Sequence, residues 1–135
     1  MPLQVSVVTP EREVWSGEAG FVVARSEGGE VGVLPGMAPF LGVLRHSVLK
    51  IEPSDGGEIW LAAHGGFLEV FEDRVTVLTP VAEIADEIDV ERARSAKERA
   101  EAALRQEETP ETLEAARRAE ARLRAAAAVG TAVYD

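Results

Sequence analysis

Two patterns of hydrophobic spacing divide this chain. Up to about residue 86 the apolar residues form short runs, and Leu3, Val5 and Val7 alternate with polar neighbours as in a half-buried strand. About ten runs, roughly eight residues apart, are separated by Gly, Pro, Asp and Ser. They lie at residues 3–7, 14–15, 21–24, 31–34, 40–44, 48–51, 59–63, 67–71, 75–78 and 81–82.

This spacing predicts an N-terminal β domain, residues 1–86, folded as an antiparallel β-sandwich or flattened barrel of about ten strands. Residues 55–57 and 72–74 have the composition of hairpin turns. No segment between two runs is long enough to hold a crossover helix, so we do not expect a parallel sheet.

From Asp89 onward the apolar residues recur every three or four positions, which is the spacing of a helix with one apolar face. Asp89 is a suitable N-cap, and Thr109 with Pro110 can begin a second helix that ends near Gly130. Residues 87–135 are therefore predicted to form an antiparallel helical hairpin. The predicted apolar faces contain Val90, Ala93, Ala96, Ala100, Ala103 and Leu104, and then Leu113, Ala116, Ala119, Leu123 and Ala126 or Ala127.

Alanine dominates both faces of this hairpin. Alanine is the best helix former, but a buried alanine removes little more than one methyl group from water, worth about 0.8 kcal/mol. The helices should therefore form readily and be held weakly. That combination fits helices that change partners, and it also fits a tightly packed hairpin in one fixed pose.

Charge and composition exclude several classes of function. The net charge is −10; residues 1–88 contribute −9 (14 acidic, 5 basic) and residues 89–135 contribute −1 (10 acidic, 9 basic). An acidic protein repels phosphate backbones, so we expect no nucleic-acid partner. The chain has no cysteine, no signal peptide is visible, and no apolar run approaches the roughly 20 residues that cross a bilayer.

Catalytic and metal-binding motifs are missing from the sequence. His46 and His64 are far apart and have no metal-ligand spacing, so structural roles are the better interpretation for both. The carboxylates belong to turns and helix faces, and no nucleophile motif is present. We therefore predict a protein that is not an enzyme, with no catalytic residue, no metal and no required cofactor.

Two stretches are rich in glycine, and the first of them allows two interpretations. Residues 28–40 combine four Gly with two Pro, and residues 64–70 begin with His64 and a Gly pair. Both fit turns or bulges, because glycine adopts backbone angles that other residues avoid. The first stretch also fits a loop that offers Met37 and Phe40 to a partner.

A cluster of cations in the second predicted helix is equally ambiguous. Pairs such as Glu114 with Arg118 could form a solvated face. The same cations could instead dock on an acidic protein surface. They are Arg117, Arg118, Arg122 and Arg124.

Four stretches in this order resemble the epsilon subunit of the bacterial F-type ATP synthase, over essentially the whole chain. They are Val-Val-Thr-Pro-Glu-Arg at 7–12, Gly-Val-Leu-Pro-Gly-Met-Ala-Pro at 32–39, Gly-Gly-Phe-Leu-Glu-Val at 65–70 and Ile-Asp-Val-Glu-Arg-Ala at 88–93. The resemblance implies a non-catalytic rotor-stalk subunit at the cytoplasmic face of the bacterial cell membrane. Its membrane association would be peripheral, through the complex alone.

The resemblance also implies partners for each part. The β domain would contact the gamma subunit and the ring of c subunits, with Glu30, Pro35, Gly36 and Met37 in the ring-contact loop. Most relatives have His where this chain has Met37, which leaves apolar contact there but no titratable group. The hairpin would inhibit ATP hydrolysis when extended, its basic face Arg117, Arg118, Arg122 and Arg124 then meeting acidic residues of the alpha/beta catalytic subunits.

The junction at 88–93 resembles the ATP-binding motif of some epsilon subunits, in which ATP is a regulatory ligand that holds the hairpin down. Arg92 and Arg99 are seven residues apart, so both project from one helix face, and the first-turn N–H groups also favour an anion. Asp89 could instead be only a cap, with Arg92 paired to Glu87 or Glu91. The implied ATP-binding residues are Glu83, Ile88, Asp89, Arg92, Ala93 and Arg99.

Two other hypotheses stay open on the sequence. One is a free-standing ATP-sensing module. The other is an unrelated β-sandwich adaptor with a coincidental helical tail. The order of residues 130–135 is left undetermined.

Overall fold

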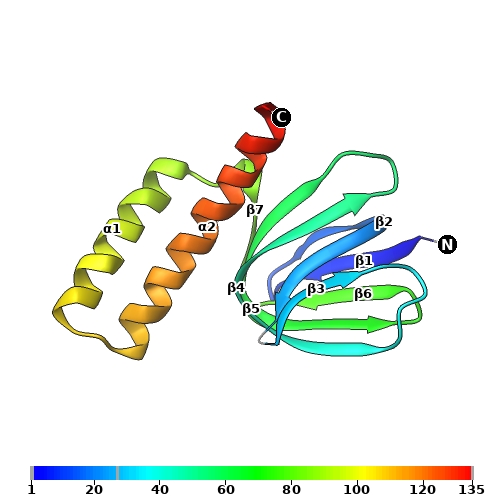
Figure 1. Cartoon of the computed structure of the whole chain (residues 1–135), viewed down its shortest axis with the longest axis horizontal. Coiled ribbons are helices and arrows are strands. Elements are labelled where there is room, and N and C mark those ends of the chain that lie inside the picture. Colours follow the sequence, from blue (N-terminus) through cyan, green and yellow to red (C-terminus); the bar gives the residue numbers. More distant parts are fainter. Residues whose placement is uncertain (1, 27, 135) are drawn as a thin grey trace.

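A computed structural model describes residues 2–26 and 28–134, and the surroundings of side chains as far as Ala126. Within this part of the chain, a β domain is followed by two packed helices (Figure 1). The elements are β1 (Leu3–Val8), β2 (Glu13–Ser26), β3 (Gly29–Val33), β4 (Phe40–Pro53), β5 (Ile59–Phe71), β6 (Arg74–Leu78), β7 (Ala82–Ile84), the 3₁₀ helix η1 (Ala85–Glu87), α1 (Val90–Gln106) and α2 (Pro110–Tyr134).

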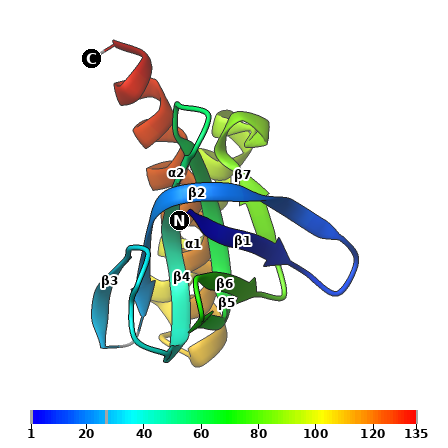
Figure 2. The same cartoon turned by 90° about the vertical axis from the view of Figure 1, so that its right-hand side faces the viewer.

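The strands close into a flattened barrel. They pair in the order β1, β6, β5, β4 and β2, and β2 then pairs with β1 again. Two shorter strands are added at the sides: β3 pairs with β2, and β7 pairs with β5. Alternate residues point inward, so Leu3, Leu49, Leu61 and Leu68 are fully buried at its centre. The predicted barrel followed by a helical hairpin is confirmed (Figures 1 and 2).

The predicted number of strands was wrong, because the described residues form seven strands rather than about ten. β2, β4 and β5 each join two of the predicted runs into one strand of 13 or 14 residues. The polar and glycine residues between the runs continue the backbone ladder. Some of them are exposed, Ser47 and His64 are buried, and the glycine pair bends β5 without ending it.

One strand pair also departs from the antiparallel prediction. β1 and β6 run parallel, with Val5 opposite Val75 and Val7 opposite Val77. The intervening strands themselves bring the chain back to β1, so this pair needs no crossover helix. The hairpin turns at 55–57 and 72–74 are present, and Glu72 and Asp73 have the positive φ angles of a tight β-hairpin turn.

The glycine pair in β5 is a bend, as the turn-or-bulge interpretation of residues 64–70 predicted. Gly65 and Gly66 have φ angles of 86° and 101°. Before them β5 pairs with β7, and after them it pairs with β6. A Cβ on Gly66 would collide with the carbonyl oxygen of Leu78, so no side chain fits there.

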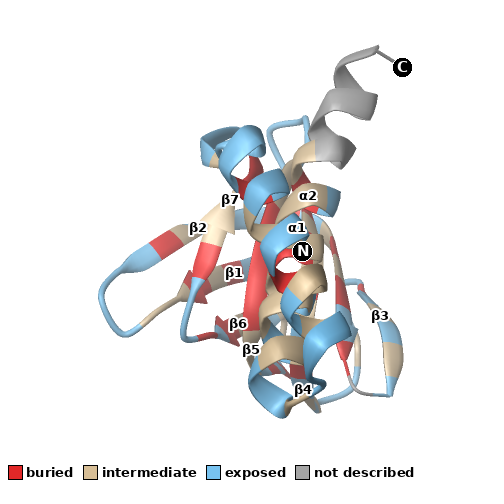
Figure 3. Ribbon diagram, turned by 90° about the vertical axis from the view of Figure 1, so that its left-hand side faces the viewer, coloured by how far each residue is buried: buried red, intermediate tan, exposed pale blue. Residues whose placement is uncertain are grey.

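The two helices begin at the predicted caps. Asp89 Oδ1 accepts a hydrogen bond from Arg92 N (3.1 Å), and Thr109 Oγ1 accepts one from Thr112 N (3.2 Å). The α2 helix lies against β4, β5 and η1, and α1 packs on the outer side of α2 (Figures 1 and 3).

Two details of the predicted helices were wrong. Because α1 packs against one helix only, its buried strip is narrow: Ala93 and Ala100 are buried, whereas Val90 and Ala103 are exposed. The second helix continues past Gly130 to Tyr134, since one internal glycine costs only about 1 kcal/mol and no proline follows. Asp135, the end of the predicted helical region, lies outside the described residues.

Candidate functional site at the barrel–hairpin interface

The apolar part of the contact between the barrel and α2 is small. Ala62 of β5, Ala85 of η1 and Ala125 of α2 are buried together. Val48, Trp60 and Ile88 pack around them and stay partly exposed. Each alanine contributes little buried area, so polar contacts have a large share in holding the hairpin on the barrel.

A chain of polar side chains crosses the same interface. His46 Nδ1 lies 3.1 Å from His64 Nδ1, because β4 and β5 place these two residues directly opposite each other. His64 Nε2 lies 3.1 Å from Glu83 Oε1, and Arg122 Nε of α2 donates to the same oxygen at 2.5 Å. At the other end, His46 Nε2 lies 3.3 Å from Glu114 Oε1 of α2. The barrel histidines are thus joined to α2 at both ends.

The histidine pair has a defined proton count. Each Nε2 must carry a proton to donate to its carboxylate, and one Nδ1 must carry a proton for the ring-to-ring bond. Three protons are one more than two neutral imidazoles hold. Two neutral imidazoles therefore satisfy two of these three contacts at a time, and protonation of both rings would set two N–H groups against each other.

Two pKa shifts follow from this arrangement. The hydrogen bond from His64 lowers the pKa of Glu83 from 4.5 to about 2; burial opposes this shift and the Arg122 guanidinium assists it. Burial lowers the pKa of His46 below its ordinary 6.5, with the neighbouring His64 and Arg118 acting in the same direction and Glu114 opposing them. Glu83 is therefore ionised, and His46 resists taking up a proton.

The structure brings the six predicted ATP-binding residues together. Glu83, Ile88, Asp89, Arg92, Ala93 and Arg99 all line one pocket of about 440 Å³ at the start of α1, within the range of small-molecule sites. Arg122 of α2 also lines it, a residue that the sequence motif did not indicate. Among the described residues, no carboxylate lies within 4 Å of the guanidinium of Arg92 or Arg99, so the pairing of Arg92 with Glu87 or Glu91 is not formed.

The predicted basic face of α2 is mostly occupied in this pose. Arg118 lies 3.9 Å from Glu114, Arg124 lies 2.8 Å from Glu120, and Arg122 contacts Glu83. Arg117 has no ion pair with any described residue. Among the described residues, Arg122 is the member of this face that is paired to the barrel, so departure of the hairpin would free Arg122 for an outside partner.

The predicted ring-contact residues are not all together. Pro35, Gly36 and Met37 lie in the loop after β3, where Gly36 N donates to Asp73 Oδ1 (2.8 Å). Glu30 lies at the opposite end of β3 from this loop, roughly 10 Å from Val33 at the usual rise of an extended strand.

The apolar side chains of this loop do not point outward as the loop interpretation expected. Met37 and Phe40 are partly buried against the core, because the loop folds back on the barrel. The exposed apolar residue is Leu34, at 56%.

An apolar row that the sequence pattern did not reveal crosses the outside of the barrel. Val43, Phe67 and Leu78 stand side by side on β4, β5 and β6, and are 43%, 48% and 50% exposed. Leu41 and Phe71 extend the row diagonally. Exposed apolar side chains in contact with one another are typical of a protein interface.

Metal ligands and membrane-spanning helices are both missing from the described residues. These residues contain no group of three or more metal-ligating side chains. Neither of their helices combines the length and the apolar composition needed to cross a membrane.

Comparison with known proteins identifies this arrangement. Residues 2–85 match the family model described as ATP synthase, Delta/Epsilon chain, beta-sandwich domain. The ATP synthase epsilon chain of Streptomyces coelicolor is 48% identical over 125 residues, covering 93% of this chain and 95% of that protein. That of Brevibacillus brevis is 45% identical over 102 residues, covering 76% and 77%.

The same fold occurs in solved structures. One chain of the Euglena gracilis mitochondrial ATP synthase superposes with a TM-score of 0.73 at 22% identity, covering 98% of this chain and 81% of that one. The barrel and hairpin define a β-sandwich subunit of the delta/epsilon class. The chain belongs to the ATP synthase epsilon chain family, and it is a non-catalytic subunit of that enzyme.

Proposed function

We propose that this chain couples the catalytic head of a proton-translocating ATP synthase to its membrane ring, as part of the rotating central stalk at the cytoplasmic face of the bacterial membrane. Family membership supports this proposal, and the exposed row Val43, Phe67 and Leu78 supplies a surface for it. A flat apolar row on rigid strands suits a permanent contact with the gamma subunit. The loop with Leu34 and Met37 suits contact with the c ring.

We infer that the helical hairpin regulates ATP hydrolysis by leaving the barrel. The observation that carries this inference is the composition of the interface. A few alanines and one row of polar side chains hold α2 on the barrel, and α2 can leave without exposing a large core. On extension, Arg122 would leave Glu83, and the basic face formed by Arg117, Arg118, Arg122 and Arg124 would meet acidic residues of the alpha/beta subunits. The docked pose is then the permissive state.

Reconstitution of the catalytic complex tests this role. The full chain should inhibit ATP hydrolysis, and a chain ending at Asp86 should bind gamma equally well without inhibiting. Replacing the four arginines of the basic face by glutamine should also relieve inhibition. Replacing Arg94 and Arg105, which lie on exposed positions of α1, should not. Equal hydrolysis with the full and shortened chains would refute the regulatory role, and failure to co-purify with gamma or the c ring would favour an unrelated adaptor.

ATP is the candidate ligand of the pocket at the start of α1. The pocket combines Arg92, Arg99 and Arg122 with the N-terminus of α1, whose partial positive charge favours phosphate. Because Arg122 comes from α2, a nucleotide held there would bridge the helices and the barrel and stabilise the docked pose.

Titration of ATP into the isolated chain tests this ligand. Heat release and a rise in melting temperature are expected at millimolar ATP. Arg92→Ala should lower the affinity for ATP at least tenfold and reduce both signals. Arg94→Ala is the matched control, since Arg94 pairs with Glu91 outside the pocket (3.0 Å). If the unmodified chain shows no heat release and no shift in melting temperature, ATP is excluded as a ligand. The proposed stalk role would not be affected by that result.

A further inference from the structure

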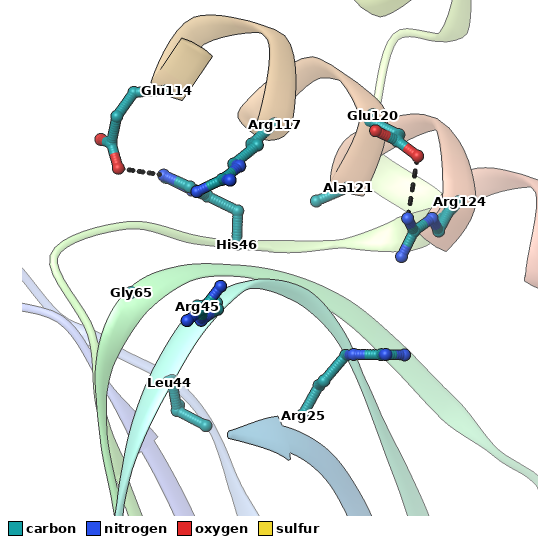
Figure 4. A pocket seen from close by; sticks show the side chains of 10 residues that line it. All are labelled: Arg25, Leu44, Arg45, His46, Gly65, Glu114, Arg117, Glu120, Ala121 and Arg124. Atoms are coloured by element: carbon teal, nitrogen blue, oxygen red, sulfur yellow. Dashed lines mark hydrogen bonds and ion pairs between the residues drawn. The ribbon is translucent and has the colours of Figure 1, made fainter. Parts of the chain in front are cut away.

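Four arginines from three elements surround a second pocket between the barrel and α2 (Figure 4). Arg25 comes from β2, Arg45 from β4, and Arg117 and Arg124 from α2. The pocket measures about 510 Å³. It shares no lining residue with the pocket at the start of α1, so the two are separate sites.

The charges in this pocket are unbalanced. Its two carboxylates are both engaged: Glu120 binds Arg124 at 2.8 Å, and Glu114 lies 3.3 Å from His46 and also near Arg118. Among the described residues, Arg25, Arg45 and Arg117 have no carboxylate within 4 Å. A chain of net charge −10 thus gathers four of its 14 cations around one hollow, and three of them have no acidic partner in the described part of the chain.

The chemistry of these groups selects a ligand class. A guanidinium offers several N–H donors in a planar fork that matches two oxygens of a phosphate. Figure 4 shows Arg25 and Arg45 on the strand side of the pocket, and Arg117 and Arg124 on α2, with Arg117 beside His46. We propose that this pocket binds a phosphate-bearing anion, either free phosphate or pyrophosphate or the phosphate chain of a nucleotide.

Such an anion would act on the hairpin as well as fill the pocket. It would contact Arg45 on the barrel and Arg117 on α2 at once, so it would bind the docked pose and not the separated one. By mass action, a ligand at one hundred times its dissociation constant stabilises the state it binds by about 2.7 kcal/mol. The binding itself does not depend on the regulatory role proposed above.

Calorimetric titration of pyrophosphate into the full chain, at low and constant ionic strength, tests the site. Arg45→Gln and Arg117→Gln should each weaken binding about tenfold, the usual loss for one charge-assisted hydrogen bond. Arg45→Lys, which keeps the charge without the fork, should give an intermediate affinity. Both substituted positions are exposed, and circular dichroism verifies that each variant is folded.

Two further variants test whether the anion binds in this pocket or elsewhere on the chain. Arg12→Gln changes the net charge equally at an exposed turn outside both pockets, and should change affinity less than about twofold. Arg92→Gln removes a lining residue of the α1 pocket and should leave pyrophosphate binding intact. ATP titrated into Arg92→Gln then distinguishes the sources: binding that Arg45→Gln abolishes identifies a nucleotide phosphate chain, and its absence identifies the free anion.

The proposal is overturned by any of three results. The first is that the unmodified chain binds no pyrophosphate. The second is that the affinity for pyrophosphate is the same in Arg45→Gln and Arg117→Gln as in Arg12→Gln. The third is that pyrophosphate binding is lost in Arg92→Gln and kept in the other variants, which would assign the anion to the pocket at the start of α1.

Discussion

Glu83 and the two histidines decide how the hairpin is held at the scale of single residues. One carboxylate oxygen of Glu83 accepts from His64 on the barrel and from Arg122 on α2. His46 connects the same pair to Glu114. Removing any member leaves a partly buried donor or acceptor without its partner, which costs more than the bond itself contributes.

Acidification should loosen the hairpin through His46. Its pKa is lowered by burial, so as the pH falls through 6.5 the unfolded chain takes up this proton before the folded chain does. The free energy of unfolding should therefore decrease from about pH 8 to pH 5, and the loss is complete only below the lowered pKa. Glu83 contributes nothing to this window, because its contribution is present above 4.5 and is lost only as the pH falls toward about 2.

Urea unfolding at several pH values measures this slope. His46→Gln cannot titrate but keeps an N–H donor for Glu114, so its slope between pH 8 and pH 5 should be smaller. An identical slope in the two proteins would show that His46 is not the responsible group.

Glu83→Gln should destabilise the docking of α2 by about 1–2 kcal/mol, since a neutral amide holds Arg122 and His64 less well than the carboxylate does. Amide hydrogen exchange in α2 measures this loss. Glu120→Gln is the matched control: among the described residues Glu120 pairs only with Arg124 on its own helix, so the expected loss is about 0.5 kcal/mol or less. Equal exchange in the two variants would contradict the special role of Glu83.

At the scale of elements, the bend in β5 determines where the interface lies. The first half of β5 carries Ala62 and His64 under α2, and the second half carries Phe67 in the exposed apolar row. Gly65 and Gly66 bend the strand between these two halves. One strand thus contributes to the surface proposed for gamma and to the surface that holds the hairpin.

Gly66→Ala should destabilise the β domain by about 2–4 kcal/mol, because the new Cβ would meet the backbone of Leu78 and Thr79 at a positive φ. Thermal unfolding measures the loss. Gly56→Ala also has a positive φ, but nothing lies within 4 Å of its Cβ, so it should cost about 1 kcal/mol. Similar melting temperatures for both variants would mean that β5 can shift away from β6.

At the scale of the whole molecule, a rigid barrel carries a hairpin attached through small residues. Leucines at the interface would add buried area and make the attachment harder to reverse. Alanines instead allow α2 to lie close to the barrel, and the polar side chains of the interface then contribute a large share of the docking energy. The molecule therefore combines a stable stalk surface with a part that can separate from it.

Ala125→Leu should weaken docking of the hairpin by about 1–3 kcal/mol, because Ala125 is fully buried between Ala62 and Ala85 and has no room for a larger side chain. Limited proteolysis and hydrogen exchange of α2 measure the release. Ala103→Leu makes the same change at an exposed position of α1 and should have little effect. Faster exchange in both variants would indicate a general loss of helix stability instead.

The local pattern of the sequence determined the element types, the caps at Asp89 and Thr109, the turns, and the division into a β part and a helical part. These depend on residues that are neighbours in the chain, so their spacing is visible in the sequence. The motif at 88–93 also indicated six residues that line one pocket.

Only the tertiary structure decided what depends on register and closure. The number of strands depended on whether the polar or glycine residues between two runs end a strand or continue it, and the pairing with neighbouring strands settles that. The parallel β1–β6 pair follows from barrel closure. His46 meets His64, Arg122 meets Glu83, and Arg45 meets Arg117 across a pocket because the register of β4 on β5 and the docking of α2 bring distant residues together. No spacing in the sequence encodes these encounters.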